Sequence, residues 1–268
     1  MPAGTSPVTN AKLVLTAEQQ HRLTLTKYPR SAKYDASWMI ANMMGPNPLW
    51  LVEALLQAMH LKPGMRVLDL GCGKAITSIF LAQEFDVQVW AADLWIAPAD
   101  NLARIEAAKL ADRVFPLRVE AHQLPFAEGY FDAVISVDAY HYFGTNDLYF
   151  AQYLAPMLKP GGELGIVVPG LANEFTEVPA HIKPYWEPAF HSFHCPDWWR
   201  RHIDHSGLVK VTKADRVSEG WRDWLTWQEV CTEAGVRPES AQREAEMLRV
   251  DAGRHLGFSR LVARTTTR

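Results

Sequence analysis

The chain has 268 residues, of which 48% are hydrophobic and 21% charged, and 27 basic against 30 acidic residues leave a net charge of −3. These values are ordinary for a globular protein, and the length suits one large domain or one domain with a cap. Nucleic-acid binding would show as a strongly basic domain or patch. The sequence therefore predicts a small-molecule substrate and no nucleic-acid partner.

The cysteines predict a reducing compartment. Cys72, Cys195 and Cys231 are too few and too widely spaced for a disulfide framework or a metal cluster. No signal peptide is recognisable, and no apolar run has the length needed to span a bilayer. We expect a cytoplasmic protein with no membrane partner. The sequence leaves the oligomeric state open, a homodimer included.

The N-terminal part predicts little regular structure. Residues 1 to about 10 are small and polar, which predicts a disordered start. Residues 27–38 mix polar and aromatic side chains with weak periodicity. They are either a lid over a pocket or a surface helix packed by Trp38. We therefore predict a helical or lid segment over residues 1–44, ahead of a main domain over residues 45–268.

The most informative stretch runs from Val67 to Ala75. It follows a short apolar run that predicts a buried strand, and it precedes residues 76–85, which predict a helix. Its two glycines allow a ligand close to the backbone at a helix N-terminus, where nucleotide-like ligands bind. The dinucleotide fingerprint needs a third glycine at the position of Ile76, so NAD is disfavoured. Asp69 would repel a pyrophosphate and would suit the cationic amine of S-adenosylmethionine (SAM).

This stretch, Asp69-Leu70-Gly71-Cys72-Gly73-Lys74-Ala75, resembles the first motif of class I SAM-dependent methyltransferases. The family usually has Gly where this chain has Ala75. The resemblance covers residues of about 45 to 170. It implies a Rossmann-like α/β three-layer sandwich with a seven-stranded, mostly parallel sheet whose last strand is antiparallel. It also implies SAM as cofactor, bound here by Asp69, Gly71, Cys72 and Gly73.

The end of the next predicted strand supplies an acid for the ribose. Asp93 follows the apolar run 87–92 and lies 20 residues after Gly73 (93 − 73 = 20). A carboxylate at this place can accept both ribose hydroxyls. By resemblance to the family, the following side chain, Leu94, packs on the adenine. Trp95 is the alternative lining of the substrate pocket.

The third predicted strand ends at an adenine-reading pair. Residues 120–126, Glu-Ala-His-Gln-Leu-Pro-Phe, are similar to the family's Asp-Ala-x-x-Leu-Pro-Phe segment, with Glu120 in place of Asp. The resemblance implies that Glu120 accepts from the adenine amino group and that the backbone N–H of Ala121 donates to a ring nitrogen. His122 is expected to face solvent.

The resemblance implies that the cofactor sulfonium and the substrate meet at the end of the fourth predicted strand, residues 131–137. Ligands of open α/β sheets bind at the carboxyl ends of strands. His141 is a candidate general base for an O–H or N–H nucleophile, or else a packed histidine. Asp138 is a candidate contact for the methionine part of SAM or for the substrate, and Tyr140 is a second catalytic candidate. Tyr142 is a candidate pocket wall.

Two insertions are predicted after the fifth strand. Residues of about 171 to 200 are rich in Pro and aromatics, which is typical of an aromatic cap over a small-molecule site, although these side chains also suit a subdomain core. Residues of about 218 to 255 predict a helical insertion. Residues 148–158, ahead of that strand, predict a further helix.

Histidines are frequent near the cap, but no metal site is predicted. Zinc needs three or four well-placed ligands, and no Cys-x-x-Cys supports one here. The histidines concerned are His191, His194, His202 and His205.

These observations predict a SAM-dependent methyltransferase that moves a methyl group to a small molecule by in-line displacement. The alternatives are a SAM-binding protein without catalysis, a nicotinamide-dependent oxidoreductase, and an enzyme of the cyclopropane-forming branch. The acceptor and its reacting atom stay open.

Overall fold

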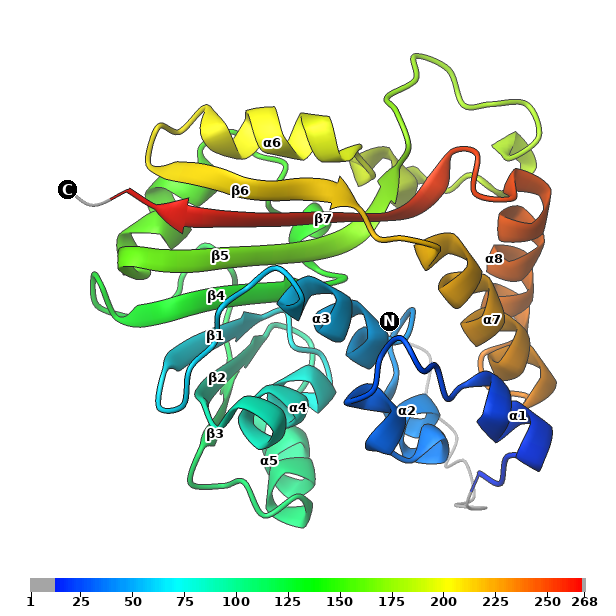
Figure 1. Ribbon diagram of the computed structural model, residues 1–268, viewed down its shortest axis with the longest axis horizontal. Coiled ribbons are helices and arrows are strands. Elements are labelled where there is room, and N and C mark those ends of the chain that lie inside the picture. The colour runs from blue at the N-terminus through cyan, green and yellow to red at the C-terminus, as the bar shows by residue number, and fades with distance from the viewer. Residues whose placement is uncertain (1–12, 267–268) are drawn as a thin grey trace, which may run out of the picture.

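A computed structural model describes residues 13–266 of the chain. It has one seven-stranded sheet in the order β3-β2-β1-β4-β5-β7-β6 (Figure 1). β7 is antiparallel to both of its neighbours, and the other pairs are parallel. The predicted fold class is therefore confirmed, including the antiparallel last strand. The strands are β1 (Arg66–Leu70), β2 (Gln88–Asp93), β3 (Val114–Arg118), β4 (Phe131–Val137), β5 (Leu158–Leu171), β6 (Val209–Arg216) and β7 (Leu256–Thr265).

Helices cover both faces of the sheet. The segment expected as a helix over residues 148–158 is helical, but it consists of a π-helix followed by a 3-10 helix. Pro156 lies in the first turn of the 3-10 helix, where its missing N–H interrupts an α-helical hydrogen-bond pattern. The disordered start expected for residues 1 to about 10 lies outside the described residues. The α-helices are α1 (Ala17–Arg22), α2 (Ala36–Asn42), α3 (Pro48–Leu56), α4 (Ile76–Phe85), α5 (Pro98–Ala107), α6 (Pro196–Asp204), α7 (Gly220–Glu233) and α8 (Pro238–Asp251). The shorter turns are η1 (Ser31–Lys33), η2 (Tyr140–Tyr142), η3 (Phe150–Leu154), η4 (Ala155–Met157), η5 (Lys183–Tyr185) and η6 (Pro188–Ser192).

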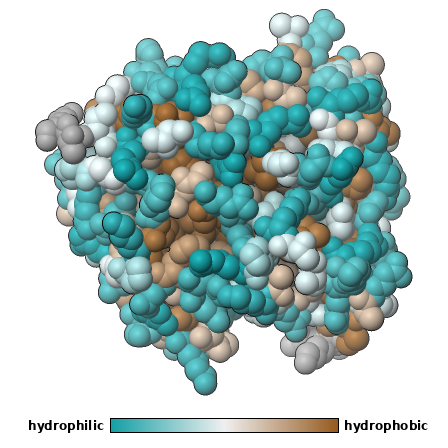
Figure 2. Space-filling model, viewed as in Figure 1, coloured by the Kyte–Doolittle hydropathy of each residue, from teal (hydrophilic) through white to brown (hydrophobic). Residues whose placement is uncertain are grey.

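The core has two parts, one on each face of the sheet. The larger contains α3, α4 and α7, with Leu55, Phe80 and Trp227 buried. The smaller lies under α6, where Trp199 and Ile203 are buried. Burial on both faces explains why the central strands β1 and β4 are buried almost throughout, whereas the edge strand β6 begins with alternating buried and exposed residues. Figure 2 shows hydrophilic residues over most of the face that Figure 1 presents.

Helix α3 begins directly after Asn47, which is its N-cap. The side chain of Asn47 accepts from the backbone N–H groups of Leu49 and Trp50 at 3.0 and 3.3 Å. Pro48 occupies the first helical position, where its missing N–H costs nothing. This cap fixes the direction of the preceding residues, which run toward the ligand edge of the sheet.

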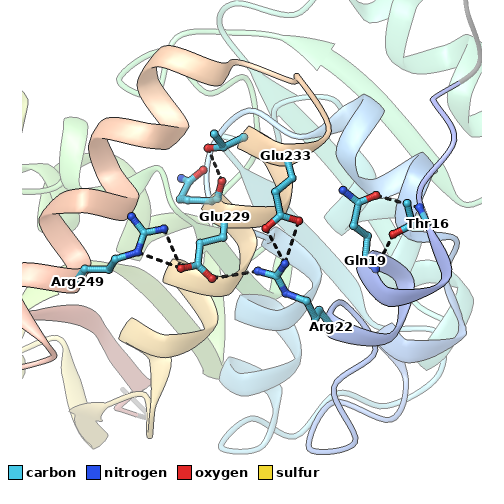
Figure 3. A network of polar contacts seen from close by, with 8 residues as sticks. Thr16, Gln19, Arg22, Glu229, Glu233 and Arg249 are labelled. Carbon is cyan, nitrogen blue, oxygen red and sulfur yellow. Dashed lines mark hydrogen bonds and ion pairs between the residues drawn. The ribbon is translucent and has the colours of Figure 1, made fainter.

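The N-terminal segment is held by the helices near the other end of the sequence. Arg22 of α1 pairs with Glu229 and Glu233 of α7 at 3.0 and 2.7 Å, and Arg249 of α8 joins Glu229 at 2.9 Å (Figure 3). These groups are partly exposed, so each pair is worth about 1 kcal/mol or less. A more buried hydrogen bond also links this segment to α7: the Tyr28 hydroxyl donates to Asp223 at 2.9 Å.

The two predicted insertions differ in structure. Between β5 and α6, the chain forms only short turns, around which Phe175, Trp186 and Phe190 pack with ring centroids 5.5 and 5.6 Å apart. The second stretch forms α7 and α8. Across residues 13–266, no helix combines the length and apolar character needed to cross a membrane.

Candidate active site

A cavity of about 570 Å³ lies at the carboxyl ends of β1, β2 and β4. Its walls come from the glycine turn after β1 and from the segments that follow β2, β3 and β4. Eight of the nine residues predicted to bind the cofactor line it, and Asp69 does not. The eight are Gly71, Cys72, Gly73, Asp93, Leu94, Glu120, Ala121 and Asp138.

The glycine turn has a backbone that side chains disfavour. Gly71 and Gly73 have φ angles of +76° and +53°. A Cβ on Gly71 would also overlap the methyl group of Ala139. Ala75, which stands where the resembled family usually has Gly, has φ 60°. A left-handed Ala costs about 1–2 kcal/mol, so the family's preference for Gly at this position has a physical reason here.

Asp69 lies behind the cavity, against the first turn of α4. Its Oδ2 accepts from the hydroxyls of Thr77 and Ser78 at 2.5 and 2.6 Å. Its Oδ1 is buried without a hydrogen-bond partner among residues 13–266. Burial raises the pKa of Asp69 to about 6, against the effect of the two hydroxyls. The expected direct contact with a cationic amine is not supported by this position, because Thr77 stands between Asp69 and the cavity.

Asp69→Ala is expected to lower the free energy of unfolding by about 2 kcal/mol, because two buried hydroxyls lose their acceptor. Asp69→Asn keeps an acceptor and is the matched control, with a smaller loss expected. Chemical denaturation of both variants measures the difference. Equal stability of the Ala variant and the parent would contradict the supporting role.

The parent and Asp69→Asn should also differ in the pH dependence of their stability. The raised pKa means that the folded chain binds more protons than the unfolded chain between about pH 4 and 6. The contribution of Asp69 to stability therefore falls as the pH rises through that window. Asp69→Asn removes this contribution, so its stability relative to the parent should improve from pH 4 to pH 6. A constant difference across that range would contradict the assignment.

Asp93 ties the end of β2 to the glycine turn. Its Oδ2 accepts from the backbone N–H of Gly73 at 2.9 Å, and its Oδ1 accepts from those of Trp95 and Ile96 at 2.7 and 3.0 Å. A carboxylate offers about four acceptor positions. Three are occupied, so one position on Oδ2 is left for a ribose hydroxyl rather than the expected two.

The acid after β3 forms a local pair. Glu120 Oε1 lies 2.8 Å from Nδ1 of His122, and Oε2 accepts from the backbone N–H of His122 at 2.8 Å. Burial opposes ionisation of Glu120, but these hydrogen bonds outweigh it and lower the pKa of the carboxyl. His122 packs edge-on against Tyr149, with ring centroids 4.9 Å apart. Glu120 is therefore held as an ionised acceptor at the wall of the cavity.

The acid after β4 is the one without a partner. Asp138 is half-buried and has φ 55°, and its side chain makes no hydrogen bond or ion pair within residues 13–266. Burial, followed by the charge of Glu244, raises its pKa to about 8. Strained backbone and an unpaired carboxyl occur together at sites that bind ligands.

The two predicted catalytic residues lie in different places. His141 is 2% exposed, its Nδ1 has no hydrogen-bond partner among residues 13–266, and burial lowers its pKa to about 3. Its ring packs on Tyr142, with centroids 4.1 Å apart, and Tyr142 lines the cavity, whereas His141 itself does not. Tyr140 packs instead against Trp199 in the core under α6. The prediction that Tyr140 is catalytic gains no support from this position.

Sequence reasoning missed the roof of the cavity. Residues 42–48, here called the roof segment, contribute Asn42, Met44 and Gly45 to its lining. Trp227 of α7 donates to the carbonyl of Gly45 at 3.0 Å, and Arg237 donates to that of Met44. Residues 27–38, for which a lid and a packed surface helix were the two alternatives, pack on α4 and do not line the cavity. The sequence feature that could have pointed to the roof segment is the break at Gly45-Pro46-Asn47-Pro48.

A left-handed glycine turn and acids at the ends of β2 and β3, arranged around one cavity, define a nucleoside-binding α/β protein. Residues 67–162 match the family model described as a methyltransferase domain. The chain is 26% identical over 216 residues to 27-O-demethylrifamycin SV methyltransferase of Amycolatopsis mediterranei, covering 78% of this chain and 77% of that protein. It is 29% identical over 197 residues to 2-methyl-6-phytyl-1,4-hydroquinone methyltransferase of Synechocystis sp., covering 67% of this chain and 57% of that protein.

Solved methyltransferase structures share the fold. Phosphoethanolamine N-methyltransferase 2 of Haemonchus contortus, solved with S-adenosyl-L-methionine, superposes with a TM-score of 0.70 at 19% identity, over 95% of this chain and 61% of that chain. Residues 67–162 therefore match a methyltransferase domain, and the chain is similar to methyltransferases in both sequence and fold.

Proposed function

We propose that the chain transfers the methyl group of SAM to a small-molecule acceptor at this cavity. The observation that carries the proposal is that eight predicted cofactor positions, spread from residue 71 to residue 138, line one cavity. Two relatives are named for methyl transfer to a rifamycin and to a hydroquinone, both small molecules. The net charge of −3 also favours a small acceptor over nucleic acid.

The wall residues suit the parts of SAM in order. Glu120 and the backbone N–H of Ala121 would read the adenine edge, with Leu94 on its face. The free position on Asp93 Oδ2 would accept one ribose hydroxyl. The glycine turn would hold the methionine part, near the unpaired carboxyl of Asp138. SAM carries an ammonium and a sulfonium, so its binding would favour ionisation of Asp138.

The reaction needs alignment more than acid or base. A lone pair of the acceptor forms a bond to the methyl carbon while the carbon–sulfur bond breaks. The sulfur keeps the two electrons of the broken bond and leaves as a neutral thioether. Holding the acceptor in line can supply about 7–11 kcal/mol. An acceptor that is an alcohol, a phenol or a protonated amine also loses a proton. His141, which packs on the cavity-lining Tyr142 and is not itself part of the lining, is our candidate for its removal, because its imidazole is neutral and its Nδ1 has no partner within the described residues.

His141→Ala is expected to lower turnover at least tenfold while SAM affinity changes less than threefold, since general bases contribute about 10²–10⁴-fold. Because burial holds the pKa of His141 at about 3, this residue should add no acidic limb to the rate profile above about pH 5. Tyr140→Phe is the matched control, because the Tyr140 hydroxyl makes no hydrogen bond within residues 13–266. An unchanged rate in His141→Ala would remove it from the chemistry.

Calorimetric titration of the chain with SAM, S-adenosylhomocysteine and NAD tests the cofactor. Binding of SAM or its demethylated product without NAD is expected. Binding of NAD alone would overturn the proposal and favour an oxidoreductase. Transfer of a labelled methyl group from SAM to a pool of small metabolites then separates an enzyme from a SAM-binding protein without catalysis. We also propose a cytoplasmic location, and the oligomeric state stays open, a homodimer included.

A further inference from the structure

Three side chains far apart in the sequence meet where the segment after β5 reaches the turn between α8 and β7. Asp251 Oδ1 lies 3.1 Å from Nε2 of His181 and 3.0 Å from Nδ1 of His255. The two imidazole rings are 5.1 Å apart. One ligand atom from each of the three residues falls within 4.8 Å of the others. Two imidazole nitrogens and one carboxylate oxygen at this spacing form a donor set suited to borderline divalent metals.

The carboxylate at the centre is buried and lacks a fixed counter-ion. The Asp251 side chain is 0% exposed, and no Lys or Arg nitrogen lies within 4.0 Å of its oxygens among residues 13–266. The backbone N–H groups of His255 and Leu256 donate to it at 3.0 and 2.9 Å. The guanidinium of Arg254 is directed to the carbonyls of Val250 and Asp251 instead. A buried carboxylate needs a charge partner, which here is either the imidazoles or a cation.

The three donors are positioned by rigid neighbours. Asp251 is the last residue of α8, and His255 directly precedes β7. His181 is placed by Ile182, which is fully buried, and by a turn in which Lys183 N–H donates to the Pro179 carbonyl at 3.0 Å. The side chains of His181 and His255 are 26% and 33% exposed, so an ion can enter from solvent. A donor set held in place from both sides loses little entropy on binding.

We propose that His181, Asp251 and His255 bind one divalent transition-metal ion of the zinc class, with water at the remaining positions. The ion replaces a proton on each coordinating imidazole nitrogen. It joins the segment after β5 to the α8–β7 turn, outside the cavity of the candidate active site, whose lining contains none of the three. The predicted absence of a metal rested on His191, His194, His202 and His205. In the structure His194 pairs with Glu174, and His202 contacts the carbonyl of Gly144.

The test titrates the chelator-stripped full chain with Co²⁺, followed by visible absorption, and with Zn²⁺, followed by calorimetry. One equivalent of Co²⁺ with ligand-field bands, displaced by Zn²⁺, is expected. His181→Ala and His255→Ala should each weaken binding at least tenfold and remove the rise in melting temperature that Zn²⁺ gives the parent. His191→Ala is the control, since His191 is exposed on the same segment and lies outside the cluster.

Two results would overturn the proposal. One is the absence of stoichiometric Co²⁺ or Zn²⁺ binding, which would leave the cluster as a hydrogen-bonded tie only. The other is binding that survives both substitutions. Circular dichroism verifies that the variants are folded before they are titrated. Neither readout uses SAM, so the result is independent of the proposed methyl transfer.

Discussion

Asp93→Ala is expected to weaken SAM binding at least about 100-fold. The variant loses the predicted ribose contact and also the acceptor for the backbone N–H of Gly73, which shapes the glycine turn. A hydrogen bond to a charged group contributes about 1.5–3 kcal/mol, and about 1.4 kcal/mol is tenfold in affinity. Two such bonds give at least the stated loss. Calorimetric titration with SAM measures it directly.

Asp100→Ala is the matched control, because Asp100 carries the same charge, lies seven residues later (100 − 93 = 7) and is exposed in the first turn of α5. Its SAM affinity should equal that of the parent. Asp93→Asn should fall between, since it keeps one oxygen acceptor. If Asp93→Ala binds SAM as tightly as Asp100→Ala does, the ribose assignment is wrong.

Gly71→Ala is expected to lower the free energy of unfolding by about 2–5 kcal/mol and to abolish measurable SAM binding. Its φ of +76° costs about 1–2 kcal/mol for an L-residue, and overlap with the Ala139 methyl adds about 1–3 kcal/mol. Denaturant unfolding and calorimetry give the two quantities. The added methyl also enters the surface that the ligand approaches.

Gly64→Ala separates the two causes. Gly64 has φ +79°, nearly that of Gly71, but no atom lies within 4 Å of an added Cβ. It should therefore show the backbone cost alone, with SAM affinity unchanged. Equal destabilisation in the two variants would show that Ala139 moves aside easily, and intact SAM binding in Gly71→Ala would refute close approach of the ligand to the turn.

Local signals made the first half of the chain predictable. The expected helix over residues 76–85 is α4, because a glycine turn and an apolar run define it without distant contacts. The acids after β2 and β3 line the cavity, as their places at strand ends imply. These features depend on residues within a few positions of one another.

Features that depend on distant contacts were not predictable. Tyr140 and Tyr142 are two residues apart in a 3-10 turn, so their side chains leave it in different directions, one to the core and one to the cavity. Asp69 accepts from the hydroxyls of Thr77 and Ser78 and does not line the cavity. The meeting of His181 with Asp251 spans 70 residues and leaves no trace in local spacing.

The contacts of the roof segment determine when it can fold during synthesis of the chain. Its carbonyls are held by Trp227 and Arg237, which follow their partners by 182 and 193 residues. A ribosome must therefore deliver most of the sequence before the roof can dock, although the glycine turn and β2 emerge much earlier. Closing such long loops is slow compared with forming a strand–turn–helix unit. Between the synthesis of Asn146, the last residue of the cavity lining, and that of Arg237, the nascent chain has the walls of the cofactor site but not the partners that hold its roof, so tight cofactor binding is expected late in folding.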